Sequence, residues 1–346
     1  MRIHFVARAL ATEWPDLKEL GEHDVAAQAV RFRGGVNNWI VQTFLRLRVP
    51  LADAGTAPTI GETFIPGCVN IAHRDCLNRL FVPYYQSFVV GIRADRSPVH
   101  LCDLEIVQNE LQPKNPSMQF LNFWPQPGLV VRDSSRGLRI ERVAYFGRAS
   151  TVPAWFHDPA WHAALAAMGM VFEIRDGRWF DYSDVDVVLA HRTEPPTVLR
   201  QKPASKLTNA WLAGTPALLA NEPAYASLRK NSLDYLAIDS PADVLAALRH
   251  LRSSPLQYAA MVANGRRRGV DYSIASTKAQ WMRFLLDRVV PEAAAWRSAR
   301  RKFAEARLSQ LARVARQKLA AKRFKLKVLM EMHEGSWPGT IASPGR

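Results

Sequence analysis

The stretch KPASKLTNAWLAGTP, residues 202–216, decides the fold of the second half of this chain. Its pattern predicts a loop that becomes a helix and then leads into a buried strand at residues 217–220. Lys202, Ser205 and Lys206 stand where the loop becomes the helix. Lysines four positions apart lie on one side of a helix, and a helix N-terminus presents free N–H groups and partial positive charge. The stretch therefore predicts a pocket for a phosphate or a diphosphate.

Short apolar strands that end in polar clusters recur on both sides of this stretch. The predicted strands are residues 3–7, 28–32, 68–72, 88–92 and 104–107 in the first half, and 142–146, 170–174, 185–190, 217–220 and 235–238 in the second. The helices predicted between or after them are residues 37–47, 161–168, 241–251 and 255–267. This alternation is typical of parallel sheets with a site at the carboxyl edge. We expect an α/β fold with two Rossmann-like, doubly wound domains.

Breaks in the pattern predict the domain boundaries. The prolines and glycine of WPQPG, residues 124–128, indicate a linker. We therefore expect an N-terminal domain over residues 1–127 and a C-terminal domain over residues 128–290. A basic helical tail follows over residues 291–334, as one long helix or two joined helices, and residues 335–346 are expected to be disordered.

Composition narrows the class of protein. The 346 residues are 48% hydrophobic, without an apolar run long enough to cross a membrane and without a secretory signal. Three widely spaced cysteines and unclustered histidines predict reduced structural thiols, no metal site and a cytoplasmic protein.

The positive charge is concentrated near the C-terminus. The net charge is +15, and residues 297–327 hold twelve Lys or Arg and one acid, which is +11 of that total. This segment predicts either contact with an anionic membrane surface or a helix packed back on the N-terminal domain with a solvated basic face. No nucleic-acid recognition motif is present, so nucleic acid is not an expected partner.

Several motifs together resemble one family. They are RVAYFGR at residues 142–148, KPASKL at 202–207, NAWLAGTP at 209–216, EPAY at 222–225, the closing Tyr272-Ser273 and Trp281, and the Gly34-Gly35 loop. They resemble the GT-B-fold glycosyltransferases, and the C-terminal part resembles the donor domain of the retaining group. The resemblance implies two Rossmann-like domains facing a cleft. It also implies transfer of a sugar from a nucleotide-diphosphate sugar to a glycan or lipid-linked acceptor in polysaccharide biosynthesis, without a metal or another cofactor, at the inner face of the membrane if the tail binds lipid.

The resemblance and the polar strand ends together assign the site. Glu222 is expected to hold the ribose, and a histidine is a suitable base because its pKa lies near neutrality. The residues assigned to the donor and its phosphates are Gly34, Gly35, Gly147, Arg148, Arg192, Lys202, Ser205, Lys206, Asn209, Glu222 and Tyr225. The candidates for activating the acceptor are His73 and Asp75, with Asp95 as the rival, and those for binding the acceptor are Arg74, Arg93, Arg96 and Asn109.

One departure from the family leaves alternatives open. Gln201 and Asn209 stand where many retaining members carry two glutamates, and an amide cannot ionise. The Gly34-Gly35 loop favours retention, but the stereochemical course stays open. A sugar-nucleotide epimerase of the same fold and a non-catalytic sugar-nucleotide-binding subunit are the alternatives. A nicotinamide dehydrogenase is disfavoured, because no GxGxxG follows either first strand.

Overall fold

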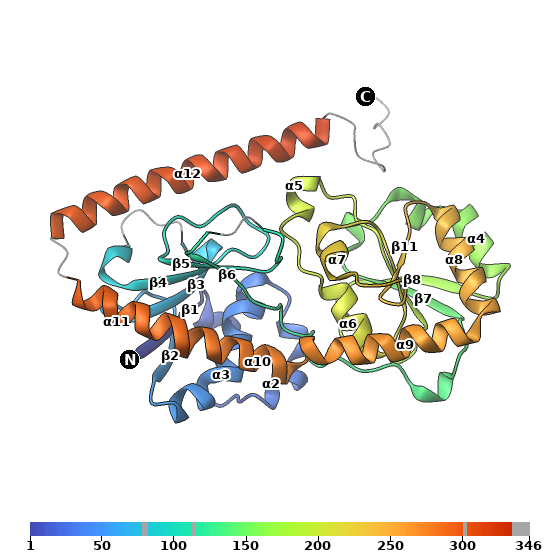
Figure 1. Ribbon diagram of the computed structural model, residues 1–346, viewed down its shortest axis with the longest axis horizontal. Helices are drawn as coiled ribbons and strands as arrows, with labels where there is room; N and C mark the ends of the chain where they lie inside the picture. Colours follow the sequence, from blue (N-terminus) through green and yellow to red (C-terminus); the bar gives the residue numbers. More distant parts are fainter. Residues whose placement is uncertain (78–81, 113–114, 300–302, 334–346) are drawn as a thin grey trace. The chain divides into compact units, whose positions relative to one another are not determined.

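The computed structural model describes residues 1–77, 82–112, 115–299 and 303–333 (Figure 1). The chain packs as two units. The first is Met1–Trp124 with Ile274–Lys327, and the second is Pro125–Ser273 with the described residues from Val328 onward.

The first unit is built on a parallel sheet of six strands. Its strands are β1 (Arg2–Val6), β2 (Ala57–Gly61), β3 (Val69–His73), β4 (Phe88–Ile92), β5 (Leu104–Val107) and β6 (Met118–Phe120). They lie in the order β2-β1-β3-β4-β5-β6, so the direction of winding reverses between β1 and β3. The inner strands β3, β4 and β5 are buried along their whole length, as their continuous apolar runs require.

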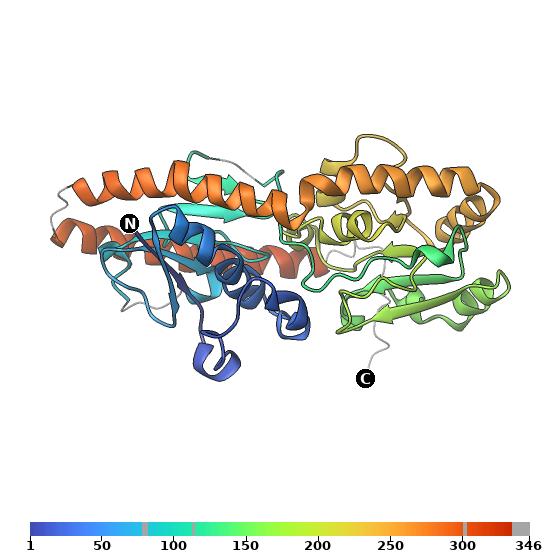
Figure 2. The ribbon, with the colours of Figure 1, turned by 90° about the horizontal axis from the view of Figure 1, so that it is seen from below.

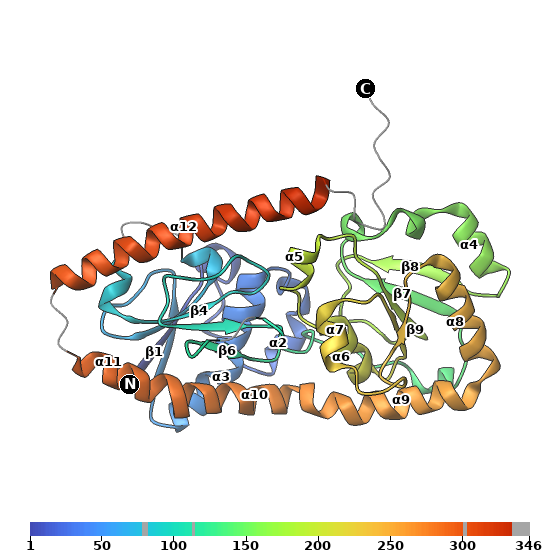
Figure 3. The same cartoon turned by 45° about the horizontal axis from the view of Figure 1, so that its top comes forward.

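Helices from both ends of the chain cover this sheet. They are α1 (Leu10–Glu13), α2 (Asp24–Ala27), the π-helix Asn37–Val41 that leads into α3 (Gln42–Asp53), α10 (Ile274–Arg283), α11 (Val290–Ser298) and α12 (Phe303–His333), with a second π-helix, Phe284–Val289, between α10 and α11. Figures 1 and 3 show α10 and α11 along one side of this unit and α12 along another. Trp39, Trp124 and Trp281 are buried in one apolar core, and the Trp124 indole donates to Thr43 on α3.

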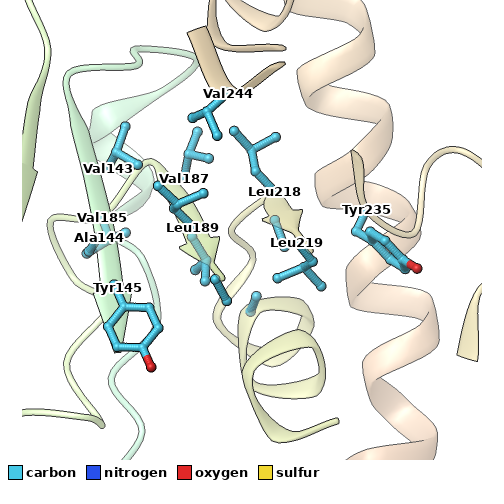
Figure 4. Packing of buried hydrophobic residues seen from close by; sticks show 14 of the residues in the cluster. Val143, Ala144, Tyr145, Val185, Val187, Leu189, Leu218, Leu219, Tyr235 and Val244 are labelled. Atoms are coloured by element: carbon cyan, nitrogen blue, oxygen red, sulfur yellow. The ribbon is translucent and has the colours of Figure 1, made fainter. Parts of the chain in front are cut away.

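The second unit holds a parallel sheet of five strands. These are β7 (Arg142–Phe146), β8 (Val171–Arg175), β9 (Val187–Ala190), β10 (Ala217–Leu219) and β11 (Leu236–Ala237), in the order β8-β7-β9-β10-β11. The helices are α4 (Pro159–Ala166), α5 (Pro196–Leu199), α6 (Ser205–Ala213), α7 (Pro223–Leu228), α8 (Pro241–Ser253) and α9 (Pro255–Gly269). Figure 4 shows how Val143, Val187 and Leu218 from neighbouring strands meet in the core of this unit.

Helix α9 packs closely on α6 in the second unit (Figure 2). Gly265 permits this approach, because a Cβ there would lie 2.9 Å from the Trp211 ring. The Trp211 indole donates to the carbonyl of Asp234, and Asn264 on α9 donates to the Asp234 carboxylate, so Asp234 links the two helices through buried hydrogen bonds. Trp124 and Trp211 are thus core residues, as their size predicts.

The structure confirms most of the predicted strands and departs from the sequence prediction elsewhere. Residues 28–32 are not a strand but contain the 3₁₀ turn Ala29–Arg31, where Arg31 donates to Asp16 and to the carbonyl of Glu13. Strands β2 and β6 were not predicted. Residues 274–290 belong to the first unit rather than to the C-terminal domain.

The predicted basic tail consists of two helices, α11 and α12, and the predicted disordered end, residues 335–346, lies outside the described residues. The three cysteines are free thiols. Among the described residues, no helix combines the length and the apolarity that crossing a bilayer requires.

Asp186 anchors the start of β7 from inside the second unit. Its carboxylate is fully buried and accepts hydrogen bonds from Arg132 and Arg136, each at 2.8 Å. It also accepts from the backbone N–H groups of Glu141 and Arg142 at 2.8 and 2.9 Å. These donors hold the pKa of Asp186 below its usual range, although burial opposes them. The carboxylate thus ties the segment before β7 to β9.

Asp186→Ala should lower the free energy of unfolding by about 3–5 kcal/mol, because Arg132, whose side chain is only 7% exposed, loses its carboxylate partner and the N–H groups of Glu141 and Arg142 lose their acceptor. Urea denaturation measures the change. Glu141→Ala is the matched control: Glu141 pairs with the same Arg136 from a half-exposed position and should cost less than about 1 kcal/mol. Equal losses in the two variants would contradict the anchoring role.

Candidate functional site

The strand order of the second sheet selects one part of its edge. Winding reverses between β7 and β9, and in open parallel sheets ligands bind at the carboxyl ends of the strands beside such a reversal. Gly147 and Arg148 follow β7 at this edge, and Arg192 follows β9. Helix α6 leads from β9 to β10 and therefore begins at the same edge.

Helix α6 begins without a side-chain cap and ends at a defined residue. Ser205 and Lys206 form its first turn, and no side chain caps its N-terminus. Gly214 ends the helix with φ +71°, a left-handed conformation that suits glycine, and the N–H of Thr215 donates to the carbonyl of Ala210. The Gly-Thr-Pro signal is thus the C-terminal cap of α6.

A buried ion pair lies beside the start of α6. Arg192 donates to Glu222 Oε2 at 3.0 Å and to the Tyr225 hydroxyl at 3.1 Å. The side chains of Arg192 and Glu222 are 5% and 2% exposed. Burial alone would lower the pKa of Arg192, but the facing Glu222 and Tyr225 raise it. The second carboxylate oxygen, Glu222 Oε1, is buried without a hydrogen-bond partner.

Lys206 lies near the ion pair of Arg192 and Glu222, and both burial and these charges change its pKa. Its Nζ lies 5.0 Å from the centroid of the Tyr145 ring. Burial, followed by the charge of Arg192, lowers its pKa well below the ordinary lysine value, and Glu222 only partly opposes this. Burial raises the pKa of Glu222 against the attraction of Arg192 and Lys206. An incoming anion would stabilise the protonated form of Lys206.

Lys202 completes the cationic cluster and has a partner that sequence reasoning missed. Its Nζ lies 2.8 Å from Glu194 Oε1. Glu194 lies two residues beyond Arg192, after β9, so its position at a strand end was the signal that could have identified it. The structure thus brings Lys202, Lys206, Arg192 and Glu222 together, as predicted, and adds Glu194.

The remaining predicted donor residues occupy different environments. Arg148 is exposed, and Gly147 leaves room for Tyr145, since a Cβ there would lie 2.8 Å from that ring. Asn209 is buried, and its side-chain oxygen accepts from the backbone N–H of Gln126 at 3.2 Å. Asn209 therefore fixes the chain where the second unit begins.

In the first unit the reversal lies between β1 and β3, and His73 ends β3. His73 is buried, and its Nε2 has no hydrogen-bond partner. A Cβ on Gly35 would lie 2.8 Å from that nitrogen, so glycine is required there by space. Gly34 and Gly35 are exposed, and Gly35 begins the helical segment that continues into α3.

The hydrogen bonds of His73 define its protonation. The N–H of Asp75 donates to His73 Nδ1 at 3.2 Å, which leaves the proton of the neutral ring on Nε2. Burial lowers the pKa of His73 to about 4, and the carboxylate of Asp75 only partly offsets it. At neutral pH the ring is therefore neutral and can donate a hydrogen bond from Nε2–H. This differs from the general base expected from the sequence.

Asp75 and Asp95 are brought together by Arg96. The guanidinium donates to Asp75 Oδ1 at 3.0 Å and to Asp95 Oδ1 at 3.1 Å. Burial would raise the pKa of Asp75, but the hydrogen bond and the charge of Arg96 lower it. Three of the predicted acceptor-side residues thus form one half-exposed cluster next to His73.

The other predicted acceptor residues hold the fold. Arg93 makes two 2.7 Å hydrogen bonds to the buried carboxylate of Glu105 on β5. The buried Arg74 donates to Ser97, and the Asn109 side chain accepts from the N–H of Leu111. Glu105 was hidden inside a predicted strand, so the partner that occupies Arg93 could not be identified from the pattern.

His73 should titrate with a pKa near 4 and carry its proton on Nε2 between pH 6 and 8. Nitrogen-15 NMR of labelled histidine, with His73→Gln to assign the signal, measures both properties. A titration near the ordinary value of about 6.5, or a proton on Nδ1, would contradict the assignment.

No protein-family model and no curated protein matches this sequence. Solved structures do match. HepE of Anabaena, crystallised with UDP and glucose, superposes with a TM-score of 0.52 at 11% identity over 83% of this chain and 100% of that chain. Sucrose-phosphate synthase of Thermosynechococcus elongatus gives 0.52 at 11% identity over 84% and 100%. A glycosyltransferase of Rickettsia africae gives 0.50 at 6% identity over 83% and 98%. These similarities show that the chain has the GT-B fold of the nucleotide-sugar glycosyltransferases, as the resemblance implied.

Proposed function

We propose that this protein is a glycosyltransferase that moves a sugar from a nucleotide-diphosphate sugar to a glycan or lipid-linked acceptor. The observation that carries the proposal is Lys206, which lies in the first turn of α6 with its Nζ 5.0 Å from the Tyr145 ring centroid and its pKa lowered by burial and by the charge of Arg192. The fold supports it, since its solved representatives include HepE with bound UDP and glucose. A cytoplasmic location and a role in polysaccharide biosynthesis remain predictions.

The second unit supplies the charge that a departing nucleoside diphosphate needs. Negative charge grows on the diphosphate as the glycosidic bond breaks, and preorganised donors aimed at developing charge form the largest catalytic contribution in many enzymes. Lys206, Ser205 and the free N–H groups of α6 take this role, with Lys202 and Arg148. Because these groups are cationic or dipolar, the proposal assigns no metal ion to the reaction.

Glu222 is assigned to the ribose. Its Oε1 is buried and without a partner, while Oε2 is held by Arg192. A ribose hydroxyl can donate to Oε1, which would satisfy an acceptor that otherwise carries a desolvation cost. Tyr225 supports the arrangement by accepting from Arg192.

The first unit is assigned to the sugar and the acceptor. The Nε2–H group of His73 donates to an oxygen of the sugar or acceptor, and Asp75, Asp95 and Arg96 bind acceptor hydroxyls. The amides of Gly34 and Gly35 contribute to binding the donor phosphates. Since His73 is a donor at neutral pH, the proton of the acceptor hydroxyl passes either to a carboxylate, Asp75 or its rival Asp95, or to the leaving phosphate; the second route accords with retention of configuration.

The sugar-nucleotide donor should raise the melting temperature of the protein, because a ligand that binds only the folded state stabilises it. A thermal-shift screen of UDP-, GDP-, ADP- and TDP-sugars identifies it. With that donor, Lys206→Ala should reduce turnover by roughly 10²–10³-fold. Lys230→Ala, which removes an exposed charge from the same unit, should leave turnover unchanged.

The products of the same reaction distinguish the alternatives, and chelation with EDTA tests metal independence. Mass spectrometry that finds the donor isomerised without an acceptor would favour an epimerase. A donor that binds but is not consumed, with acceptors present, would favour a non-catalytic subunit, for which Gln201 and Asn209 are the motivating observation. Turnover by Lys206→Ala equal to that of the unaltered protein would overturn the assignment of Lys206.

Binding of the diphosphate should be accompanied by proton uptake at pH 8. The free protein holds Lys206 with a lowered pKa, and the bound anion raises that pKa, so the complex takes a proton from the buffer. Calorimetry in buffers of different ionisation enthalpy should give a positive slope of the observed enthalpy. Lys206→Met should remove the slope and Lys230→Met should not; a flat line for the unaltered protein would contradict the lowered pKa.

A further inference from the structure

Helix α12 docks on the first unit through an unusual set of residues. Val314 is buried, and so are Gln310 and Gln317. Gln310 donates to the carbonyl of Val82 at 2.8 Å and accepts from the N–H of Tyr85 at 3.0 Å. Gln317 accepts from the N–H groups of two further residues of the same unit, His100 and Leu101. The docked face is therefore held by amide hydrogen bonds, and Arg313 beside it donates to the carbonyl of His100 and pairs with Asp103.

The opposite face of α12 is apolar and exposed. At about 3.6 residues per turn, positions spaced by three and four residues form one stripe. Leu308, Ala312, Ala315, Leu319 and Leu326 have this spacing and are all exposed, the leucines at 67%, 48% and 49%. These five residues are called the outer stripe below. An amphipathic helix ordinarily directs such a stripe toward the core. In α12 the outer stripe faces away from the core and is exposed.

Basic residues flank the outer stripe on both sides. Counting about 100° per residue places Arg316, Arg323 and Lys327 along one border and Lys318, Lys322 and Lys325 along the other. All six are exposed. Within the described residues 305–327 the single acid is Glu305. The helix thus presents leucines between two rows of positive charge.

Three kinds of partner could cover the outer stripe, namely a second copy of the chain, a nucleic acid or a lipid bilayer, and the charge pattern favours one of them. A second copy would set basic rows against basic rows, and like charges beside an apolar seam oppose pairing. A nucleic acid would neutralise the rows but leave the leucines in water. An anionic bilayer surface satisfies both, because acyl chains receive the leucines and headgroups neutralise the flanks.

We propose that α12 lies in the plane of an anionic phospholipid surface, with the outer stripe inserted and its docked face still bound to the first unit. The inference does not depend on the donor chemistry, so either one can fail alone. It would place the enzyme where a lipid-linked acceptor resides.

Co-sedimentation of the full chain with vesicles tests the proposal. Binding is expected to vesicles of phosphatidylcholine with phosphatidylglycerol, not to phosphatidylcholine alone, and should weaken at high salt. The charge variant Lys318→Gln/Lys322→Gln/Arg323→Gln should lose roughly 100-fold in affinity, since each basic residue near an anionic leaflet contributes about fivefold. The stripe variant Leu308→Gln/Leu319→Gln/Leu326→Gln should lose at least about tenfold.

Matched controls separate these effects from general loss of charge or apolar surface. Arg178→Gln/Lys230→Gln/Arg249→Gln removes three exposed charges from the second unit, and Leu256→Gln removes a leucine that is 87% exposed there. Both should bind vesicles like the unaltered protein. Circular dichroism and melting temperatures confirm that every variant is folded.

Absence of binding to anionic vesicles, or binding that survives both triple variants, overturns the proposal. A dimer in solution that the stripe variant dissociates, without vesicle binding, would assign the stripe to a second copy instead. A DNA complex without vesicle binding would overturn it in favour of nucleic acid.

Discussion

The buried pair of Arg192 and Glu222 is the constraint on which the chemistry of the second unit depends. Two desolvated charges are tolerated only when they satisfy each other, and Glu222 uses one oxygen to do so. The other oxygen is left for a ligand, and Arg192 leaves Lys206 facing a like charge. The ion pair therefore leaves one carboxylate oxygen without a donor and places Lys206 beside a like charge. A ligand with hydroxyl donors and a diphosphate supplies the two missing interactions, which is why we favour a nucleotide sugar over a simple phosphate.

The first unit has a reversal of strand order like that of the second unit, but it carries a different side chain at that edge. At its reversal the strand end carries His73, whose ring is kept neutral by burial and oriented by the N–H of Asp75. Such a ring cannot become positively charged at neutral pH, but it can donate one directed hydrogen bond. The nearby Asp75 carboxylate is fixed by Arg96, which lowers its pKa and keeps it ionised. In the function we propose, the second unit stabilises the charge of the leaving group, and the first unit orients hydroxyl groups.

Sequence patterns predicted those parts of the fold that depend on burial alone. Strands such as Val69–His73 and Leu104–Val107 are buried on both faces, so their apolar runs are continuous and visible. Strand Ala57–Gly61 at the sheet edge is half-exposed and was missed. The meeting of side chains that follow neighbouring strands was predictable, as with Arg192 after β9 and Glu222 after β10. It was not predictable where a partner comes from inside a strand, because Glu105 gives no signal that it would occupy Arg93.

Helix α12 does not follow the usual pattern in which a helix buries its apolar face and exposes its polar face. In α3 the buried face contains Phe44, Leu47 and Leu51, and apolar burial alone explains why it packs. In α12 the buried positions include Gln310 and Gln317, while leucines face water. Hydrogen bonds between amides and backbone contribute little net free energy, so they position this helix more than they stabilise the fold. A helix positioned in this way leaves its hydrophobic free energy unrealised. That free energy becomes available only when another apolar phase covers the outer stripe, and the surrounding positive charge restricts that phase to an anionic one.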